Sequence, residues 1–304
     1  MAWRVVRAHR GSGSSVVVHA RAEDGYKEEF MFTKHKPYLY VLENENHQDS
    51  AIVGAKVGFT SLYGDKLKRL YLKNPSDTPH VRELFSKHFE ADVPYARRFL
   101  IDKGVTSWFD FVDSKGEDII PVPPPEPVPS LKVGFLDLEC RPPAPNIMPN
   151  WENDPITCVC IGSEGDYASG IYDPEIGFSG TNGDNWAIVH FPTEEKLLWW
   201  VAEMLEEQDY DIISGWNLSF DTDYLRKRCE ILKIPLSLDG SCEFDLLAGY
   251  KALYRRRSYR LKDIVVDEGI VPTQEPVVDY AKLWEENKPG LLQRNKNHTE
   301  WCYQ

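Results

Sequence analysis

The 304-residue sequence contains no apolar run approaching the roughly eighteen residues of a membrane-spanning helix. Its first residues, Met1 to Arg7, lack the hydrophobic core of a secretion signal, and we expect a cytoplasmic protein. The six cysteines are scattered, and Cys158 and Cys160 stand one residue apart instead of in a C-x-x-C zinc pattern. They are therefore predicted to be reduced thiols. No internal repeat is present.

An excess of basic residues is also absent. The net charge is −13, which argues against a protein that coats nucleic acid by its overall charge. One local segment, Tyr250–Lys262, carries six basic residues and no acidic ones, with tyrosines interleaved. This segment is either a track for single-stranded nucleic acid, through Tyr254, Arg257 and Tyr259, or a solvated helix face.

Two domains are predicted, separated by a proline-rich extended connector at residues 119–130. The first domain, residues 1–118, is predicted to be mixed and β-rich. Its predicted strands are Val16–Ala20, Glu29–Thr33 and Pro37–Leu42, and its predicted helix is His80–Phe89. In the second domain, residues 131–304, strands near 132–138, 156–162 and 211–214 alternate with helices near 194–207 and 219–232. This alternation predicts an α/β fold with ligands at strand ends.

Two neighbouring carboxylates are the first candidate metal ligands. The apolar run Val133–Leu136 is typical of a buried strand, and Asp137-Leu138-Glu139 follows it directly. Side chains two residues apart in a strand share a face, so Asp137 and Glu139 are expected to point the same way. Such a pair raises both pKa values unless a cation lies between them, and hard oxygen ligands suit Mg²⁺ or Mn²⁺. Taken alone, the pair is also compatible with two solvated acids at a strand end.

A third acid occurs later in the chain. The segment Asp211–Asn217 is typical of a short buried strand that ends in a turn, and helical spacing begins near Phe220. Asp221 is therefore expected in the first turn of a helix beside the strand end. Asn217 is alternatively a simple turn residue, and Asp221 a favourable charge at a helix start. The two motifs in this order favour a metal site.

An Asp-x-Glu strand followed by Asn-x-x-Phe-Asp resembles the first two motifs of the DEDD 3′–5′ exonuclease superfamily. The surrounding sequence is similar to the N-terminal and proofreading part of family B DNA polymerases, of archaeal or phage type. The stretches that carry this resemblance are Lys36–Tyr40, Asp92–Gly104, Leu131–Cys140, Asp211–Arg228 and Ser258–Asp263. The resemblance implies an RNase H-like exonuclease domain that follows a β-rich N-terminal domain. If the source is viral, the expected location of the protein is the host cytoplasm.

The resemblance also implies a reaction, the hydrolysis of 3′-terminal nucleotides of DNA by a two-ion mechanism with Mg²⁺ or Mn²⁺. Asp137 would hold both ions. Glu139 would complete the ligands of the ion that activates water, and Asp221 would hold the other ion. The residues implied to contact the terminal nucleotides are Leu138, Asn217 and Phe220. The substrate would be a single-stranded 3′ end or a primer–template.

The family's third motif, Tyr-x-x-x-Asp, supplies a tyrosine and a fourth carboxylate, and it is expected near or past residue 304. Tyr303 is either the tyrosine of this motif or a near neighbour. We therefore expect an exonuclease domain truncated before or at the third motif, with low activity in isolation. A second polypeptide carrying the polymerase palm, fingers and thumb would complete it. The alternatives are a free-standing DEDD nuclease with Asp263 as fourth ligand, from the match Tyr259–Asp263, and a catalytically silent DNA-binding module.

In archaeal relatives, part of the N-terminal domain forms a pocket that reads uracil in template strands. The matching residues here are Pro37, Tyr38, Val93, Pro94, Tyr95 and Arg98. The resemblance implies such a pocket, and the alternative is an ordinary domain core with Arg98 at the surface.

Overall fold

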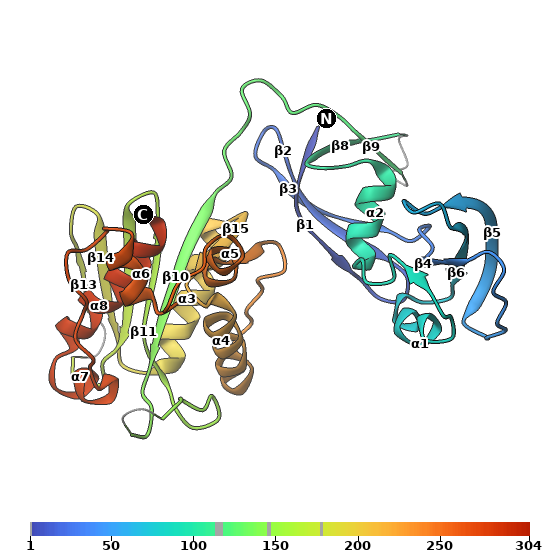
Figure 1. Ribbon diagram of the computed structural model, residues 1–304. Helices are drawn as coiled ribbons and strands as arrows, with labels where there is room; N and C mark the ends of the chain where they lie inside the picture. The colour runs from blue at the N-terminus through green and yellow to red at the C-terminus, as the bar shows by residue number, and fades with distance from the viewer. Residues whose placement is uncertain (1, 113–117, 145–146, 177–178) are drawn as a thin grey trace. The chain divides into compact units, whose positions relative to one another are not determined.

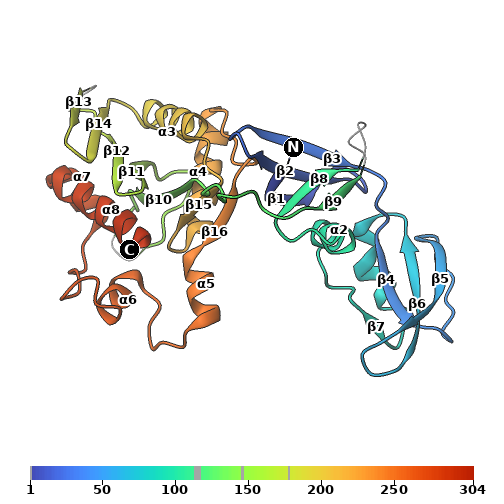
Figure 2. The ribbon, with the colours of Figure 1, turned by 90° about the horizontal axis from the view of Figure 1, so that it is seen from above.

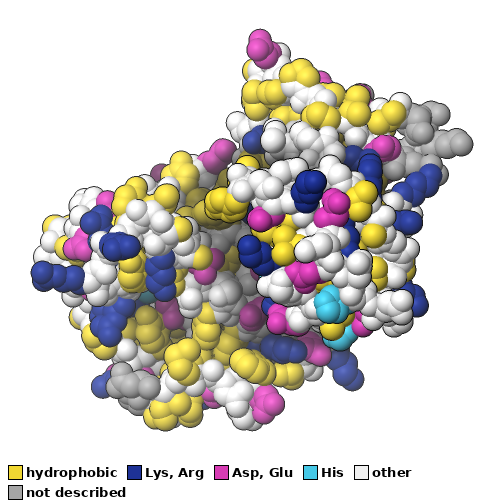
Figure 3. All heavy atoms as spheres, turned by 45° about the vertical axis from the view of Figure 1, so that its right-hand side comes forward, with side chains coloured by type: hydrophobic (Ala, Val, Ile, Leu, Met, Phe, Trp, Pro, Cys, Tyr) yellow, Lys and Arg dark blue, Asp and Glu magenta, His cyan; other side chains and the backbone are white. Residues whose placement is uncertain are grey.

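The computed structural model describes residues 2–112, 118–144, 147–176 and 179–304 (Figure 1). The chain divides into two compact units, an N-terminal unit of residues 1–129 and a C-terminal unit of residues 130–304. Within the described ranges, no helix is both long and apolar enough to cross a lipid bilayer. On the face seen in Figure 3, basic and acidic side chains are interspersed.

The N-terminal unit contains two antiparallel sheets. The first has the order β3-β2-β1-β8-β9, with β1 (Trp3–Arg10), β2 (Val16–Ala22), β3 (Lys27–Phe32), β8 (Trp108–Phe111) and β9 (Ile119–Pro121). The second has the order β5-β6-β4-β7, with β4 (Tyr38–Leu42), β5 (Ile52–Thr60), β6 (Lys66–Leu72) and β7 (His88–Phe89). The helices are the 3₁₀ helix η1 (Pro75–Asp77), α1 (Thr78–Arg82) and α2 (Tyr95–Lys103).

The predicted strands of this unit are confirmed by β2, β3 and β4, but the helix predicted over His80–Phe89 is wrong in its second half. Val81 and Phe85 have helical spacing, and both are buried in the core beside β4. The helix nevertheless ends at Arg82, and His88–Phe89 pairs with β4 as a strand. Tertiary packing therefore overrides the local helical pattern here. The start of the expected connector also differs, because residues 119–121 form β9 and pair with β8.

The C-terminal unit is built on one mixed seven-stranded sheet with the order β13-β14-β12-β11-β10-β15-β16. Its strands are β10 (Val133–Cys140), β11 (Ile156–Ser163), β12 (Asp166–Tyr172), β13 (Ser179–Asn182), β14 (Trp186–Phe191), β15 (Ile212–Gly215) and β16 (Cys242–Asp245). Its helices are α3 (Glu194–Gln208), α4 (Leu218–Leu232), α5 (Leu246–Leu253), α6 (Leu261–Asp267), α7 (Tyr280–Glu286) and α8 (Lys288–Tyr303). The predicted strands and helices of this domain and its α/β class are confirmed.

The sheet is covered on both faces. Figure 2 shows α3 and α4 on one side of the sheet and α7 and α8 on the other. Leu136 and Leu138 of β10 belong to the large apolar core that includes α3 and α4. Leu291 and Leu292 of α8 pack on the opposite face, in a separate core with strands β11 and β12. Alternation along β10 therefore directs its leucines to one layer and its acids to the other.

Candidate functional site

The candidate site lies at the carboxyl ends of β10 and β15, which pair in parallel. Gly215 ends β15, and a Cβ atom there would lie 2.5 Å from the carbonyl oxygen of Leu136. Only glycine permits this close approach of the two strands. Asn217 then adopts a left-handed conformation with φ of 63° and turns the chain into α4. Asp221 consequently lies in the first turn of α4, as the sequence predicts.

Three carboxylates gather here, from two elements. Asp137 and Glu139 come from β10, and Asp221 comes from α4, where its Oδ1 accepts a hydrogen bond of 3.3 Å from the backbone nitrogen of Leu138. Glu139 is 8% exposed and Asp221 is 5% exposed. Burial, followed by the charge of Asp137, raises the pKa of Glu139 to about 8. The same two causes raise the pKa of Asp221 well above its ordinary value.

A histidine that the sequence reasoning missed faces these acids. His298 Nδ1 lies 3.6 Å from Asp137 Oδ2 and 3.6 Å from Glu139 Oε1. Its Nε2 lies 3.3 Å from Glu275 Oε2. Burial lowers the pKa of His298, but hydrogen bonding to Asp137 and Glu275 outweighs burial and raises the pKa to about 10. In this structure the imidazolium therefore partly neutralises the carboxylates.

The neighbouring turn of α8 holds Asp137 directly. Asn295 Nδ2 donates to Asp137 Oδ2 at 2.7 Å and to the Asp137 carbonyl oxygen at 3.0 Å. The side chain of Asn295 is fixed in turn by Cys158, whose thiol donates to its Oδ1 at 3.1 Å. Cys302 lies one turn beyond His298, and burial together with the charge of Asp137 raises the pKa of its thiol. The sequence contained a signal for this face of α8. Asn295, His298 and Cys302 follow Leu291 at intervals of three or four residues, which is the spacing of one helix face.

The donor set fits a divalent cation. One ligand atom from each of Asp137, Glu139 and His298 lies within 4.8 Å of the others, in a search of the described residues. Carboxylate oxygens combined with an imidazole nitrogen are a common ligand set for first-row transition metals. Asp221 lies outside that group, although its pKa responds to the charge of Asp137. A bound cation would relieve the repulsion that raises the pKa values of Glu139 and Asp221.

The three residues implied to contact terminal nucleotides lie near the turn that joins β15 to α4. Leu138 is buried in the core, with 5% of its surface exposed. Phe220 is partly buried, and its ring lies 5.6 Å from that of Tyr224. The backbone nitrogen of Asn217 donates to Asp245 Oδ1 at 3.1 Å. Their contact with DNA stays a prediction.

The basic segment is not one helix face, because α5 ends at Leu253 and residues 254–260 are outside helices. Tyr254 is 48% exposed, and Arg257 is exposed as well. The hydroxyl of Tyr259 donates to the carbonyl oxygen of Tyr254 at 3.0 Å. Trp216, in the turn before α4, donates from Nε1 to the carbonyl oxygen of Tyr259 at 3.0 Å. The segment is therefore tied to the turn that carries Asp221.

Two other acid and tyrosine candidates do not join the carboxylates. Asp263 lies in the first turn of α6, where it accepts hydrogen bonds from the Ser258 hydroxyl and from Gln274 Nε2. It is not a member of the group formed with His298. Tyr303 packs edge-on against Phe135, with ring centroids 5.8 Å apart, and is 48% exposed.

The N-terminal unit contains a pocket of about 280 Å³ at the positions matched to uracil recognition. Its lining includes Pro37, Tyr38, Pro94, Tyr95 and Arg98. Arg98 is 5% exposed and pairs with Glu90, so the alternative that places Arg98 at the surface is wrong. Uracil recognition itself stays a prediction.

The sequence is similar to known proteins. Residues 86–249 match the family described as "DNA polymerase family B, exonuclease domain". A DNA polymerase from Methanocaldococcus jannaschii is 24% identical over 264 residues, which are 77% of this chain and 15% of that protein. A DNA polymerase from Archaeoglobus fulgidus is 30% identical over 189 residues, which are 57% of this chain and 21% of that protein.

The similarity extends to a solved structure. The family B DNA polymerase from the hyperthermophilic archaeon Pyrobaculum calidifontis superposes with a TM-score of 0.73 and 17% identity. The superposition covers 100% of this chain and 45% of that chain. At this identity the likeness shows a shared fold. The chain thus spans less than half the length of each of these relatives.

Proposed function

Because the chain belongs to the exonuclease-domain family of family B DNA polymerases, we propose that its C-terminal unit removes 3′-terminal nucleotides from DNA. The observation that carries the proposal is the convergence of Asp137, Glu139 and His298 beside Asp221 at the end of β10. Buried acids that repel one another and share a strand end are costly for folding alone, and they suit the binding of a cation.

In this proposal a divalent ion, Mg²⁺ or Mn²⁺, is held by Asp137, Glu139 and His298, with Asp221 as a further ligand. When bound, it supplies an activated water and stabilises the charge of the leaving oxygen. Asn295 orients the carboxylate of Asp137 through its hydrogen bond of 2.7 Å. Glu275 accepts from His298 Nε2 and so directs Nδ1 toward the carboxylates. Such contacts to ligands tune metal affinity strongly in other proteins.

The site differs from the family's third motif in a specific way. His298 and Cys302 have the spacing of Tyr-x-x-x-Asp and lie on the α8 face next to the carboxylates. We therefore propose that α8 contributes an imidazole and a thiol where the family has a phenol and a fourth carboxylate. An imidazole nitrogen favours Mn²⁺ over Mg²⁺, so we expect higher activity with Mn²⁺.

The DNA strand would approach along the basic segment. Tyr254 and Arg257 are exposed, and Tyr259 is tied to Trp216 beside the site. Aromatic faces and guanidinium groups together bind single strands by stacking and phosphate contact. This arrangement supports entry of a single-stranded 3′ end.

We also propose that this unit works within a DNA polymerase, on a primer–template, with a second polypeptide carrying the palm, fingers and thumb, in the cytoplasm. The support is that the relatives described above are DNA polymerases. Primer extension by the chain alone would contradict the need for the second polypeptide.

The test is degradation of a 3′-labelled single-stranded oligonucleotide by the purified chain with Mn²⁺, against an EDTA blank. Asp221→Asn should abolish the product, whereas the control Asp223→Asn, at an exposed carboxylate of the same helix, should not. Equal activity of the Asp221→Asn variant would refute the proposal. Metal-dependent strand binding without product would instead assign a silent 3′-end-binding module, the second candidate. The observation that favours it is that α8 presents a thiol, Cys302, one turn after His298.

A further inference from the structure

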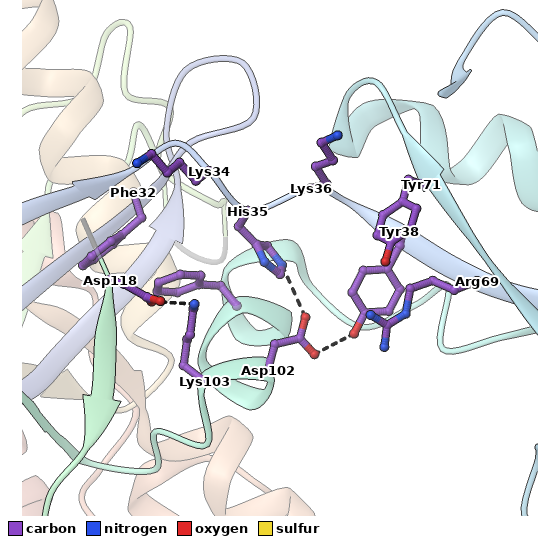
Figure 4. A pocket seen from close by; sticks show the side chains of 11 residues that line it. Phe32, Lys34, His35, Lys36, Tyr38, Arg69, Tyr71, Asp102, Lys103 and Asp118 are labelled. Atoms are coloured by element: carbon purple, nitrogen blue, oxygen red, sulfur yellow. Dashed lines mark hydrogen bonds and ion pairs between the residues drawn. The ribbon is translucent and has the colours of Figure 1, made fainter. Parts of the chain in front are cut away.

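A second cavity lies wholly within the N-terminal unit and has no role in the chemistry proposed above. Its volume is about 560 Å³, within the range of small-molecule sites. It opens between the segment that joins β3 to β4, the strand β6 and the end of α2 (Figure 4). Tyr38 lines both this cavity and the smaller pocket matched to uracil recognition, whereas His35, Lys36 and Arg69 line this cavity and not the smaller pocket.

A buried nitrogen without a hydrogen-bond partner belongs to a residue in the wall of this cavity. The side chain of His35 is only 10% exposed, and its Nε2 has no hydrogen bond among the described residues. The nearest carboxylate oxygen, Oδ2 of Asp102, is 3.7 Å away, beyond hydrogen-bonding distance. Figure 4 shows the His35 ring between Phe32 on one side and Tyr38 on the other. Buried polar atoms are almost always paired, so an unpaired one in a cavity wall is a candidate for ligand contact.

The state of the His35 ring is set by its surroundings. Burial lowers the pKa of His35 and outweighs the opposing effect of Asp102, while Lys103, Arg98 and Arg69 lower it further. Asp102 is itself engaged, because it accepts a hydrogen bond of 2.6 Å from the Tyr38 hydroxyl. A neutral imidazole offers Nε2 as a donor or an acceptor to a polar heterocycle, depending on its tautomer.

The walls combine aromatic rings with positive charge, in a chain whose net charge is −13. Four cations line the cavity against two carboxylates, and one of these, Asp118, already pairs with Lys103. Within the described part of the chain, neither Lys36 nor Arg69 has a carboxylate at ion-pairing distance. Arg69 is held in place by the Tyr40 hydroxyl and by the ring of Tyr38, 4.1 Å from its guanidinium carbon. The cavity wall thus carries two positive charges that have no carboxylate at ion-pairing distance among the described residues.

We propose that this cavity binds a nucleotide unit, with its base against the aromatic wall at His35 Nε2 and its phosphate at Lys36 and Arg69. A planar heterocycle satisfies the buried nitrogen and packs on the rings, and a phosphate accounts for the two cations. A free mononucleotide and one nucleotide of a single strand share this chemistry. The site is independent of the carboxylate site, since all of its residues belong to the N-terminal unit.

The test uses the full chain in EDTA, so that no strand is cleaved. Imidazole ¹H–¹⁵N spectra are recorded during titration with dTMP, with a short oligothymidylate and with inorganic phosphate, and the His35 signals are identified by their loss in His35→Phe. We expect the His35 signals to move with dTMP or with the oligothymidylate. We expect His35→Phe and Lys36→Glu to weaken that binding by about three- to tenfold or more, the size of one hydrogen bond or ionic contact. Lys87→Glu, at an exposed lysine outside the cavity, is the matched control and should bind as the unaltered chain does.

The outcomes separate the sources and the alternatives. Binding of dTMP as tight as that of the strand assigns a free nucleotide, and binding of the strand alone assigns a single-stranded ligand. Phosphate binding as tightly as dTMP would overturn the base contact and leave a simple anion site. His35 signals that no probe moves, or equal effects of Lys36→Glu and Lys87→Glu, would overturn the proposal entirely.

Discussion

The change Glu139→Gln removes one buried charge of the carboxylate site while keeping the shape of the side chain. In the metal-free chain, burial and Asp137 raise the pKa of Glu139 to about 8, from its ordinary value of 4.5. The folded protein therefore keeps a proton on Glu139 over a pH range in which the unfolded chain has lost it. The stability from this group is fully present below pH 4.5 and is lost as pH rises toward 8.

The size of this loss follows from the shift in pKa. Each unit of pKa corresponds to about 1.4 kcal/mol, so the unaltered chain should lose about 3 to 6 kcal/mol of unfolding free energy across this range. Glu139→Gln lacks the titrating proton and should not show that loss. His298 adds a pH dependence of its own, because its pKa of about 10 in the folded chain exceeds its ordinary value of 6.5 and its stabilising effect declines above pH 6.5. Both chains carry His298, so the difference between their unfolding free energies reports on Glu139.

The assay is urea denaturation followed by tryptophan fluorescence, in EDTA, at several pH values between 4.5 and 8.5. The free energies of the unaltered chain and of Glu139→Gln should diverge progressively as pH rises, in favour of the variant. Glu203→Gln, at an exposed glutamate of α3, is the matched control and should follow the unaltered chain. Parallel pH profiles for the unaltered chain and Glu139→Gln would show instead that ionising Glu139 in the folded chain costs no stability.

Three further changes test other parts of the C-terminal unit. Arg228→Met leaves Glu194 buried without its ion-pair partner and should lower the unfolding free energy by about 3 to 5 kcal/mol in urea denaturation, whereas an unchanged midpoint would contradict it. Gly215→Ala places a Cβ against the backbone of Leu136 and should lower the unfolding free energy by about 1 to 3 kcal/mol in the same assay. An unchanged unfolding free energy would mean that β10 and β15 can move apart at no cost. The double change of Tyr254→Ala and Arg257→Ala should weaken single-strand binding at least about tenfold. It should also reduce the slope of log K against log salt concentration by about 0.7 per lost phosphate contact. Fluorescence anisotropy at several salt concentrations measures both effects, and an unchanged slope would mean that Arg257 does not contact the strand.

The carboxylates on β10 were predictable because a strand has a strict period of two. Leu136 and Leu138 lie in the core with α3 and α4, and Asp137 lies on the other face against α8. Asp221 was predictable for a related reason, since β15 and the start of α4 follow from local patterns. The resemblance to family B polymerases is confirmed by the match over residues 86–249.

The contribution of α8 was not predictable in the same way. His298 meets Asp137 only because Leu291 and Leu292 seat the helix on the sheet, and this contact joins residues far apart in the sequence. Local spacing indicates a helix face but does not say which strand it covers. The helix predicted over residues 80–89 fails for a similar reason, because pairing of β7 with β4 overrides the helical spacing of Val81 and Phe85.

Mn²⁺ bound to the chain reports whether Asp137, Glu139 and His298 together hold a divalent cation. Pulsed electron paramagnetic resonance detects ¹⁴N coupling when an imidazole nitrogen coordinates Mn²⁺. We predict bound Mn²⁺ with such a coupling, loss of the coupling in His298→Gln, and loss of the bound ion in Asp137→Asn. Absence of bound Mn²⁺ in the unaltered chain, or a bound ion without nitrogen coupling, would mean that these three residues do not form a cation site.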